Sequence, residues 1–342
     1  MAVARKLASI QKILDILPHA NADTLEIARV LGWKVCVKKG EFKVGDYCVY
    51  MEIDSMLPQK PEFEFLRSKG FRIKTVRLRG EVSQGIAFPL SILDGYKVHD
   101  QHQEIPYLED LDVTELIGVV KYEPAIHFAI GGEIKGHFPE FLKKTDETRI
   151  QAFPRLLDRY KGERFYVTEK LDGSSMTVYF KDGMFGICSR NYELRETEGN
   201  ALWATAKRLH LPEKLTAFGR NIAIQGELIG PGIQGNKYKV KEHQFRPFNA
   251  ININEAKRIG AVELFSLCSA LDLEPVPVID FWFVLNHTVD DIVSYAEGKS
   301  ALNSNTEREG VVIRYIEEKY DEDIGDLSFK VISPNFLLKS DE

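Results

Sequence analysis

The chain has 342 residues, of which 44% are hydrophobic and 28% are charged, and its formal net charge is −6. This length predicts two domains, and the composition is typical of a globular protein in water. No apolar run is long enough to span a membrane and the N-terminus lacks a signal peptide, so we expect an intracellular protein of the cytoplasm or nucleus, neither secreted nor membrane-bound. The net charge argues against a protein that coats DNA, although a local basic patch could still bind nucleic acid.

Residues 1–120 are predicted to form a small β-barrel, because short strands alternate with turns rich in glycine, proline and asparagine. The expected strands are Leu7 to Ile16, Thr24 to Val30, Lys34 to Val37, Tyr47 to Ile53, Phe71 to Leu78 and Gly85 to Pro89. A longer connection covers residues 54–70. This number of strands with one long connection fits the open Greek-key barrel called the OB-fold, which would bind nucleic acid.

Three stretches of this region resemble the tRNA-binding type of OB domain. They are ILPHANADTLEIARV, KKGEFKVGDYCVYMEIDSMLP and RIKTVRLRGEVSQGIAF. The resemblance lies in the P-H-x-N-A-D-x-L turn, the G-D-x-V strand entry and the R-G-x-x-S-x-G-I strand. We expect the turn residues His19, Asn21 and Asp23 to serve turn geometry, because asparagine and aspartate side chains bond the local backbone.

Basic residues crowd one part of the expected barrel. They are Arg67, Lys69, Arg72, Lys74, Arg77 and Arg79. Some of them share a strand face by the period of two, so they would form a positive stripe that suits a nucleic-acid backbone. Lysine and arginine also protect exposed sheet edges, so an ordinary solvated edge strand is the alternative.

Residues 121–148 are expected to link the two domains. The segment is rich in glycine and proline and shows little helical or strand periodicity. Because it also carries several apolar residues, we expect it to lie on the surface of one domain or the other. The four cysteines of the chain are scattered and form no C-x-x-C pair, which predicts buried free thiols: Cys36, Cys48, Cys188 and Cys268.

Residues 149–342 are predicted to form an α+β domain. The expected strands are Phe165 to Thr168, Ser175 to Phe180, Gly186 to Cys188, Ile222 to Leu228, Ala261 to Leu267, Phe281 to Leu285, Gly310 to Tyr315 and Leu327 to Ile332. Helices are expected from Asn200 to Leu209, where apolar residues share one face, and from Asp290 to Lys299.

The turn between the first two of these strands carries Glu169-Lys170-Leu171-Asp172-Gly173. A lysine at the mouth of a sheet, followed by a carboxylate and a glycine, is a candidate covalent nucleophile. The tetrapeptide K-x-D-G alone is also typical of an exposed hairpin turn in which Lys170 and Asp172 are only solvated. The other stretches of the domain have to decide between the two.

Five further stretches follow EKLDG at the ends of expected strands. They are CSRN at 188–191, QGELIGPGIQGN at 225–236, ELFSL at 263–267, REGVVIR at 308–314 and LSFKVIS at 327–333. In this order, the series resembles the covalent nucleotidyltransferase superfamily of polynucleotide ligases and mRNA capping enzymes. With the OB domain in front, the chain is most similar to ATP-dependent RNA ligases of the Naegleria and Deinococcus type. DNA ligases and capping enzymes place an OB domain after the last motif, where this chain has only a few residues.

The resemblance implies a two-sheet nucleotidyltransferase domain that binds ATP, with Lys170 as the nucleophile that forms a lysyl-AMP intermediate. It implies nucleotide contacts from Glu169, Asp172, Arg190, Asn191, Glu227, Phe265, Glu309, Lys330 and Arg149. Phe265 would stack on the purine, although a core phenylalanine is an equal alternative. Lys330 would contact the α-phosphate and support the departure of pyrophosphate.

The carboxylates near Lys170 raise a difficulty, because acids beside a lysine raise its pKa and keep it protonated. Mg²⁺ or Mn²⁺, held directly or through its waters by Asp172, Glu227 and Glu309, would favour the neutral amine and offset the phosphate charge. The last motif also lacks the second lysine of many relatives, since Ser328 precedes Phe329-Lys330. Lys237, Lys239 or Lys241 could supply that charge.

We therefore expect a monomeric ATP-dependent RNA ligase that joins 3′-hydroxyl and 5′-phosphate ends of RNA or of an RNA-containing nicked duplex, as in RNA repair. A ligase that prefers DNA strands is the nearest alternative. A noncatalytic RNA- or tRNA-binding protein with a nucleotide-sensing domain is the alternative from another class.

Overall fold

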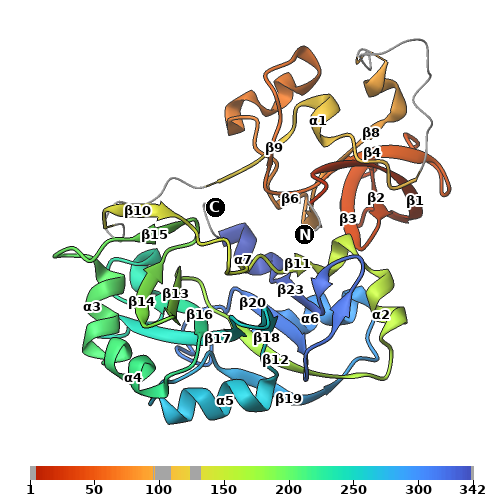
Figure 1. Cartoon of the computed structure of the whole chain (residues 1–342). Coiled ribbons are helices and arrows are strands. Elements are labelled where there is room, and N and C mark those ends of the chain that lie inside the picture. The colour runs from red at the N-terminus through yellow and green to blue at the C-terminus, as the bar shows by residue number, and fades with distance from the viewer. Residues whose placement is uncertain (1–4, 95, 97–108, 124–131, 340–342) are drawn as a thin grey trace. The chain divides into compact units, whose positions relative to one another are not determined.

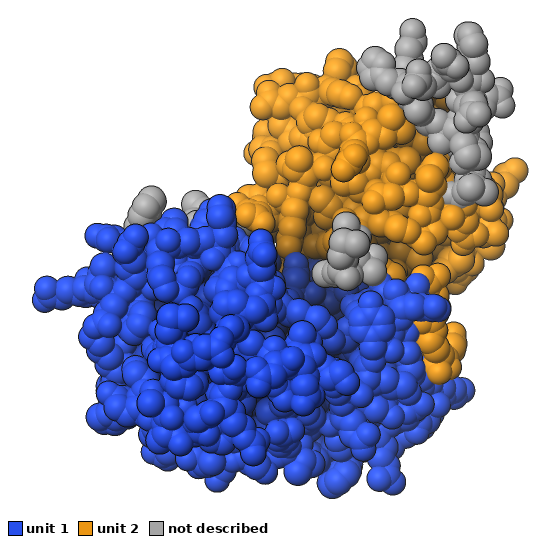
Figure 2. All heavy atoms as spheres, viewed as in Figure 1, with its two compact units in different colours: residues 1–2, 125–149, 160–336 blue, residues 3–124, 150–159, 337–342 orange. Residues whose placement is uncertain are grey.

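The computed structural model describes residues 5–94, 96, 109–123 and 132–339 (Figure 1). The chain divides into two compact units (Figure 2). Unit 1 comprises residues 1–2, 125–149 and 160–336, and unit 2 comprises residues 3–124, 150–159 and 337–342. The domain boundaries expected at 120 and 149 stay a prediction. No helix in the described ranges is long and apolar enough to cross a membrane.

Unit 2 is built on a curled antiparallel sheet of five strands in the order β3-β2-β1-β4-β8. The strands are β1 (Ala8–Pro18), β2 (Leu25–Val30), β3 (Trp33–Lys38), β4 (Tyr47–Met51) and β8 (Ile86–Pro89). A register shift between Ile13 and Asp15 lets β1 pair with β2 along one half and with β4 along the other. Ile10, Ile13 and Trp33 are fully buried beneath the sheet. These five strands confirm five of the six expected ones.

Shorter elements complete unit 2. A small two-stranded sheet pairs β5 (Ser55–Met56) with β9 (Val120–Lys121), and a hairpin pairs β6 (Val76–Leu78) with β7 (Glu81–Ser83). The helices are η1 (Pro61–Lys69), η2 (Leu90–Leu93), α1 (Thr114–Ile117), η3 (Ile150–Ala152) and α2 (Arg155–Arg159). The expected strand from Phe71 to Leu78 is wrong over its first half. Gly70 (φ +62°) and Phe71 (φ +60°) both adopt the left-handed conformation, so the chain turns there and pairing starts only at Val76.

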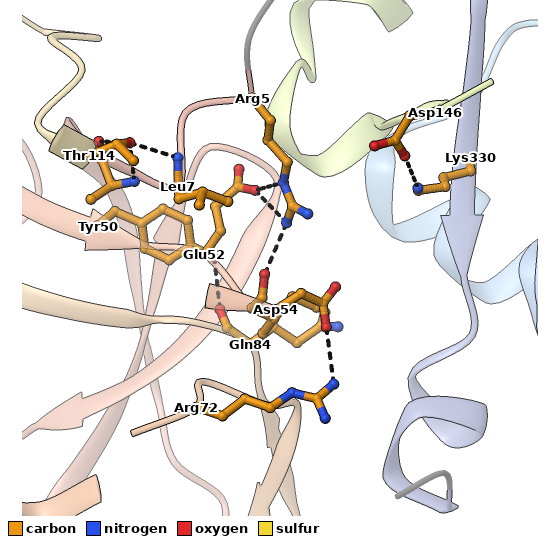
Figure 3. Close-up of polar contacts among 12 residues, drawn as sticks. Arg5, Leu7, Tyr50, Glu52, Asp54, Arg72, Gln84, Thr114, Asp146 and Lys330 are labelled. Carbon is orange, nitrogen blue, oxygen red and sulfur yellow. Dashed lines mark hydrogen bonds and ion pairs between the residues drawn. The ribbon is translucent and has the colours of Figure 1, made fainter. Parts of the chain in front are cut away.

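A polar network inside unit 2 includes Arg72, one of the residues expected on the basic stripe (Figure 3). Arg5 Nε donates to Glu52 at 2.8 Å, and Arg72 pairs with Asp54 at 3.7 Å. The Arg72 guanidinium also lies 3.5 Å from the ring centroid of Tyr122, and the residue is 6% exposed. The placement of Arg72 on an exposed stripe is therefore wrong, because its charge is used inside the unit.

Unit 1 contains two sheets. The first has seven strands in the order β10-β15-β14-β13-β16-β17-β18, and the second has five in the order β11-β23-β20-β12-β19. The strands of the first are β10 (Ile134–His137), β13 (Ser174–Lys181), β14 (Met184–Cys188), β15 (Tyr192–Leu194), β16 (Ile222–Ile229), β17 (Gln244–Asn252) and β18 (Lys257–Arg258). Those of the second are β11 (Thr148–Arg149), β12 (Arg164–Lys170), β19 (Val278–Val284), β20 (Gly310–Tyr315) and β23 (Ser328–Ile332). The pair β21 (Tyr320–Asp321) and β22 (Gly325–Asp326) forms a separate small hairpin.

The helices of unit 1 pack on these sheets. Helices α3 (Ala201–Arg208), α4 (Leu211–Phe218) and α5 (Ala261–Ala270) share a buried core with the seven-stranded sheet, and α6 (Val289–Ala296) packs against β23. The short helix η4 (Gln234–Asn236) follows β16, and α7 (Pro334–Lys339) follows β23. Both expected helices are confirmed. Asn200 caps α3 by accepting from the N–H of Leu202 at 2.9 Å, and Thr288 and Asp291 form a capping box on α6.

One expected strand of unit 1 is wrong, because residues 261–267 belong to helix α5. The buried residues Leu264, Leu267, Cys268 and Leu271 follow the helical spacing and face the seven-stranded sheet. A short apolar run is compatible with a strand as well as with a buried helix, so the pattern alone did not separate the two. Of the expected linker, residues 124–131 lie outside the described residues, and β10 pairs with β15 in unit 1.

Candidate active site

The turn that carries Lys170 joins the two sheets of unit 1. Lys170 is the last residue of β12 in the five-stranded sheet, and β13 begins at Ser174 in the seven-stranded sheet. The two expected strands are confirmed, but the segment is not a hairpin. A side chain at Gly173 would place its Cβ 2.5 Å from the Leu228 carbonyl oxygen. The glycine therefore lets this turn lie directly against β16.

The strand register places several cations on one face of the five-stranded sheet. Lys170 pairs with Gly310, and Thr168 pairs with Val312, which in turn pairs with Lys330. Lys330 also pairs with Arg149 of β11. Because side chains alternate along a strand and paired residues share a face, Lys170, Lys330 and Arg149 point to the same side.

That face is turned toward the seven-stranded sheet. Arg314 lies two pairs further along the same face, and its guanidinium is 5.4 Å from the ring centroid of Phe248 on β17. The partly buried Glu147 pairs with Arg314 at 3.3 Å and with Arg258 of β18 at 3.6 Å. Arg258 also pairs with Asp326 at 3.5 Å. The space between the two sheets is thus lined by charged groups, as a phosphate-bearing ligand requires.

Lys170 lies among three carboxylates. Its Nζ is 2.5 Å from Oε1 of Glu309, and 27% of the lysine side chain is exposed. Burial lowers the pKa of Lys170, but the charges of Glu309, Glu227 and Asp172 outweigh burial and raise it above its ordinary value. In the ligand-free protein the amine is therefore protonated, as the sequence predicted from its acidic neighbours.

Glu227 is a partly buried member of this group, whereas Asp172 and Glu309 are buried. Burial raises the pKa of its carboxyl to about 8, with Lys170 opposing that shift and Glu309 and Asp172 adding to it. Its Oε1 accepts the N–H of Gly173 at 3.0 Å, which fixes the carboxyl beside the turn. At neutral pH Glu227 therefore retains a proton for most of the time.

Asp172 is held by two neighbours that the sequence did not assign to it. Its backbone N–H donates to the Tyr238 hydroxyl at 2.7 Å, and its carboxylate pairs with Lys237. The Lys237 Nζ also lies 4.3 Å from the ring centroid of Phe336. Of the three lysines considered as substitutes for the missing second lysine, Lys237 is the one beside the site, whereas Lys239 and Lys241 are exposed.

The acids fit a hydrated divalent cation better than a directly ligated one. Within the described ranges, no group of three or more His, Cys, Asp or Glu side chains could hold a bare metal ion. Three acids nevertheless raise the pKa of Lys170 through their charge: Asp172, Glu227 and Glu309. They outnumber the nearby cations Lys170 and Lys237. Carboxylate oxygens are hard ligands suited to Mg²⁺ or Mn²⁺ and its waters.

Glu169 points to the other side of β12. Its Oε2 accepts the N–H of Ala301 at 2.8 Å, and the residue is 1% exposed. Burial raises the pKa of its carboxyl, while Ser300 and the Ala301 N–H oppose that shift. The carboxylate is thus held on the face opposite Lys170. The nucleotide contact that the resemblance implies for Glu169 stays a prediction.

Asp146 holds two of the predicted phosphate-binding cations. Its carboxylate is 3.2 Å from Lys330 Nζ (Figure 3) and 3.9 Å from the Arg190 guanidinium. Arg190 lies in the turn between β14 and β15, so the pair links the two sheets. Asn191 follows in that turn, where its side-chain oxygen accepts from Lys144 at 3.1 Å. Arg149 is buried in β11.

Phe265 lies away from Lys170. Its ring is 6.1 Å from that of Tyr166 and 5.7 Å from that of Phe281, in a cluster between α5 and β19. Tyr166 precedes Lys170 by four strand residues, or roughly 13 Å. Sequence reasoning did not consider Phe248, which packs against a buried cluster that includes Leu171, the residue directly after Lys170. Pro247 obscured β17 in the sequence, although its alternating apolar residues are a strand signal.

The remaining basic residues of the predicted stripe lie on two elements of unit 2. Arg67 and Lys69 belong to η1, where Arg67 pairs with Glu64 at 3.0 Å. Arg77 and Arg79 are exposed on the β6–β7 hairpin, and Lys74 immediately precedes that hairpin. Nucleic-acid contact by these five residues stays a prediction.

Comparisons with known proteins agree with this architecture. A family model described as an OB-fold domain matches residues 7–90, and the RNA ligase model matches residues 163–332. Among solved structures, an apo mutant of Naegleria gruberi RNA ligase is 41% identical, with 99% of each chain covered and a TM-score of 0.86. A mutant of that ligase with ATP and Mn is 40% identical over 98% of this chain and 99% of that one, with a TM-score of 0.86.

A third structure, that ligase with PPi, is 41% identical over 98% of this chain and 99% of that one, with the same TM-score of 0.86. A search of curated proteins found no match. Two facing sheets, a lysine ringed by acids and an OB-fold domain in front define a polynucleotide-joining enzyme of the nucleotidyltransferase fold. The chain belongs to the RNA ligase family.

Proposed function

We propose that this RNA ligase uses ATP and a divalent cation, magnesium or manganese, to join a 3′-hydroxyl end to a 5′-phosphate end in three steps. The observation that carries the proposal is the placement of Lys170. Its amine ends β12 on the face turned toward the second sheet, 2.5 Å from Glu309, with Lys330 and Arg149 on the same face. The ATP and Mn of the related Naegleria gruberi structure support the choice of nucleotide and cation.

In the first step the neutral amine of Lys170 attacks the α-phosphorus of ATP. A nitrogen–phosphorus bond forms, the bond to pyrophosphate breaks, and the amine loses a proton. Oε1 of Glu309 is placed to accept that proton because it already lies within hydrogen-bond distance. Lys330, Arg149 and Arg190 would hold the phosphate oxygens and stabilise the charge that develops on the leaving pyrophosphate.

Asp172, Glu227 and Glu309 would hold the hydrated cation. When bound, it supplies positive charge that favours the neutral form of Lys170 and offsets charge on the phosphates. Lys237 holds Asp172, and Tyr238 fixes the backbone of the same residue. These two residues keep the acidic group in place beside the nucleophile.

In the second step an oxygen of the RNA 5′-phosphate attacks the phosphorus of lysyl-AMP, and the nitrogen–phosphorus bond breaks as Lys170 recovers a proton. In the third step the oxygen of the 3′-hydroxyl attacks that 5′-phosphate and loses its proton. The phosphodiester bond forms, the phosphoanhydride bond breaks, and AMP leaves. Arg190 and Asn191 lie in an exposed turn beside the site, from which they would meet the 5′-phosphate or the ribose. The purine would stack on Phe248 rather than on Phe265. Phe248 packs against the cluster that includes Leu171, whereas Phe265 lies with Tyr166 and Phe281.

The substrate is RNA, and we propose a nicked RNA-containing duplex whose backbone is held by the basic residues of unit 2. A nick presents both ends together, so one bound strand aligns the 3′-hydroxyl with the adenylylated 5′ end. Arg77 and Arg79 support this proposal because they extend from an exposed hairpin of the OB-fold domain.

The proposal is tested with α-labelled ATP and magnesium. We expect acid-labile label on the full-length protein that survives denaturation, disappears in Lys170→Ala and persists in the exposed control Lys161→Ala. Labelled protein should then pass AMP to a nicked RNA duplex. Absence of protein-bound label would favour a noncatalytic RNA-binding protein, and label that persists in Lys170→Ala would refute the assignment of the nucleophile.

A further inference from the structure

The tip of the β6–β7 hairpin has a strained backbone. The two-residue turn Arg79-Gly80 joins Leu78 to Glu81, and both turn residues have positive φ, +44° for Arg79 and +101° for Gly80. Positive φ at both positions is the signature of a type I′ turn, which favours asparagine or glycine. An arginine in the left-handed region is unfavourable there, so the surrounding structure must maintain it.

The turn between β1 and β2 holds this tip from outside the hairpin. Asn21 Nδ2 donates to the Arg79 carbonyl at 3.0 Å, and His19 Nε2 lies 3.1 Å from the Leu78 carbonyl. The Asn21 N–H donates to His19 Nδ1 at 3.1 Å. Since an N–H cannot accept and a carbonyl cannot donate, Nδ1 of His19 is the acceptor and Nε2 carries the proton.

The contact is close on both sides. A Cβ at Gly80 would lie 2.9 Å from Asn21 Nδ2, so a side chain there would displace the clamp. The Arg77 guanidinium donates to the Gly80 carbonyl at 2.9 Å and closes the turn from within the hairpin. Three consecutive carbonyls, at residues 78, 79 and 80, are therefore each bonded by a side chain.

The base of the hairpin is also fixed. Ser83 Oγ accepts the N–H of Cys36 at 3.0 Å, and the Gln84 N–H donates to the Lys34 carbonyl at 2.8 Å, both on β3. The Tyr50 hydroxyl donates to the Gln84 carbonyl at 2.9 Å. With tip and base both held, the hairpin presents its exposed side chains in one arrangement.

Arg79 is the exposed cation that this arrangement presents. Within the described part of the chain its side chain forms no ion pair or hydrogen bond, whereas the guanidinium of Arg77 is bonded to the turn. Leu78 beside it is 38% exposed and presents an apolar side chain next to the guanidinium. A free guanidinium next to an apolar side chain suits a phosphate oxygen with its neighbouring ribose.

We propose that Arg79 is a preformed contact for an RNA phosphate and that His19 and Asn21 are its positioning residues. The inference rests on the proposed function, in which the OB-fold domain holds RNA. It gives the P-H-x-N part of the turn sequence a role beyond its own turn. The left-handed Arg79 keeps its conformation because Asn21 and His19 bond the two carbonyls that flank its backbone.

The test is a double-mutant cycle in the full-length protein with Asn21→Ala, Arg79→Ala and both together. The affinity for a labelled nicked RNA duplex is measured over a range of salt concentrations. Arg79→Ala should weaken binding and reduce the slope of log affinity against log salt by roughly 0.7 to 0.9, the value of one phosphate contact. Asn21→Ala, which changes no charge, should reduce the slope as well, and the double variant should match Arg79→Ala.

Controls separate this inference from the proposed function and from misfolding. Lysine adenylylation, which requires only unit 1 residues, should be unchanged in all variants, and melting followed by circular dichroism reports folding. If Asn21→Ala melts early, the pair His19→Ala and His19→Gln replaces it, since glutamine keeps a donor for Leu78 and should restore binding. Lys39→Ala removes an exposed cation elsewhere on the barrel and should leave the Asn21 effect intact.

The outcomes are distinct. No effect of Arg79→Ala would remove the hairpin from the proposed RNA contact. If Arg79→Ala and Asn21→Ala weaken binding by simply additive amounts, or if only Arg79→Ala weakens it, the positioning role is overturned. RNA binding by Arg79 would remain in place. Coupled loss in the cycle is the result that we expect.

Discussion

Replacing Glu227 with glutamine should stabilise the ligand-free protein at alkaline pH and abolish its adenylylation. Glutamine keeps an oxygen that can accept the Gly173 N–H at 3.0 Å, so the turn beside Lys170 retains its support. The substitution removes only the charge. Glu227 is partly buried, and the loss of solvent around its carboxyl raises its pKa to about 8 from an ordinary value of 4.5.

The sign follows from the direction of that shift. An acid whose pKa is higher in the folded protein is harder to ionise there, so stability falls as pH rises from 4.5 to about 8. A difference of about 3.5 units corresponds to about 5 kcal/mol well above pH 8 and to about 1 kcal/mol near pH 5. The glutamine variant escapes this loss, so its advantage over the wild type should grow by a few kcal/mol from about pH 5 to about pH 9.

Urea unfolding at several pH values, followed by tryptophan fluorescence, measures the effect. Trp203 and Trp282 both lie in unit 1 and report on its unfolding. Titrating groups away from the acidic group around Lys170 cancel when the two proteins are compared at each pH. Glu255→Gln, an exposed carboxyl in the same unit, is the control and should show no growing difference. A stability difference that does not change with pH, or a wild type that is the more stable at high pH, would refute the reasoning.

Two further substitutions test the geometry of the site. Gly310→Ala should prevent adenylylation and lower the melting temperature. The φ angle of Gly310 is +159°, and a Cβ there would lie 2.0 Å from the Val331 carbonyl oxygen. Normal labelling of this variant by α-labelled ATP would contradict the assigned packing beside Lys170. Asp146→Asn should lower the KM for ATP about two- to fivefold in the adenylylation assay, with little change in kcat. The carboxylate competes with phosphate for Lys330 and Arg190, and an exposed ion pair contributes up to about 1 kcal/mol. An unchanged or raised KM would show that Asp146 does not occupy the phosphate position.

Much of the active site was predictable because each group lies in or directly beside a strand with a recognisable sequence. Lys170, Glu227, Glu309 and Lys330 belong to β12, β16, β20 and β23 or directly adjoin them, and all four strands were expected. The resemblance supplied their order, and antiparallel pairing then brought distant segments together. Residues whose roles depend on loops were not predictable in the same way. Lys237 approaches Asp172 across 65 positions, and no periodicity reports such a contact.

The segment around Phe265, which was expected to be a strand and is a helix, shows where pattern reasoning fails. Phe265 lies in a run of apolar residues that is too short to reveal a period, and tertiary packing of Leu264 and Leu267 made it a helix. Phe248 lies in a real strand, but Pro247 beside it produces a register shift against β16 and hides the alternation. Which of the two rings stacks on the purine stays a prediction, because that property depends on the other sheet.

The His19-Ala20-Asn21 turn shows the opposite case, in which the sequence motif was seen and its reach was not. Asparagine side chains commonly bond their own turn, so a local role was the natural expectation. In the structure Asn21 bonds the backbone of Arg79, which is 58 positions away. A turn motif therefore indicates only that its side chains form hydrogen bonds with backbone groups. The fold determines which backbone groups those are.

The charge balance around Lys170 links the acids to the cation. Asp172, Glu227 and Glu309 would carry three negative charges against the two positive charges of Lys170 and Lys237, all in partly or fully buried positions. In the ligand-free site, the raised pKa of Glu227 keeps a proton on that carboxyl, which reduces the excess of negative charge. A bound cation would remove the need for that proton, and the same positive charge would let Lys170 give up its own. Proton and cation are thus alternative ways to balance one acidic group, and only the cation leaves the lysine free to attack.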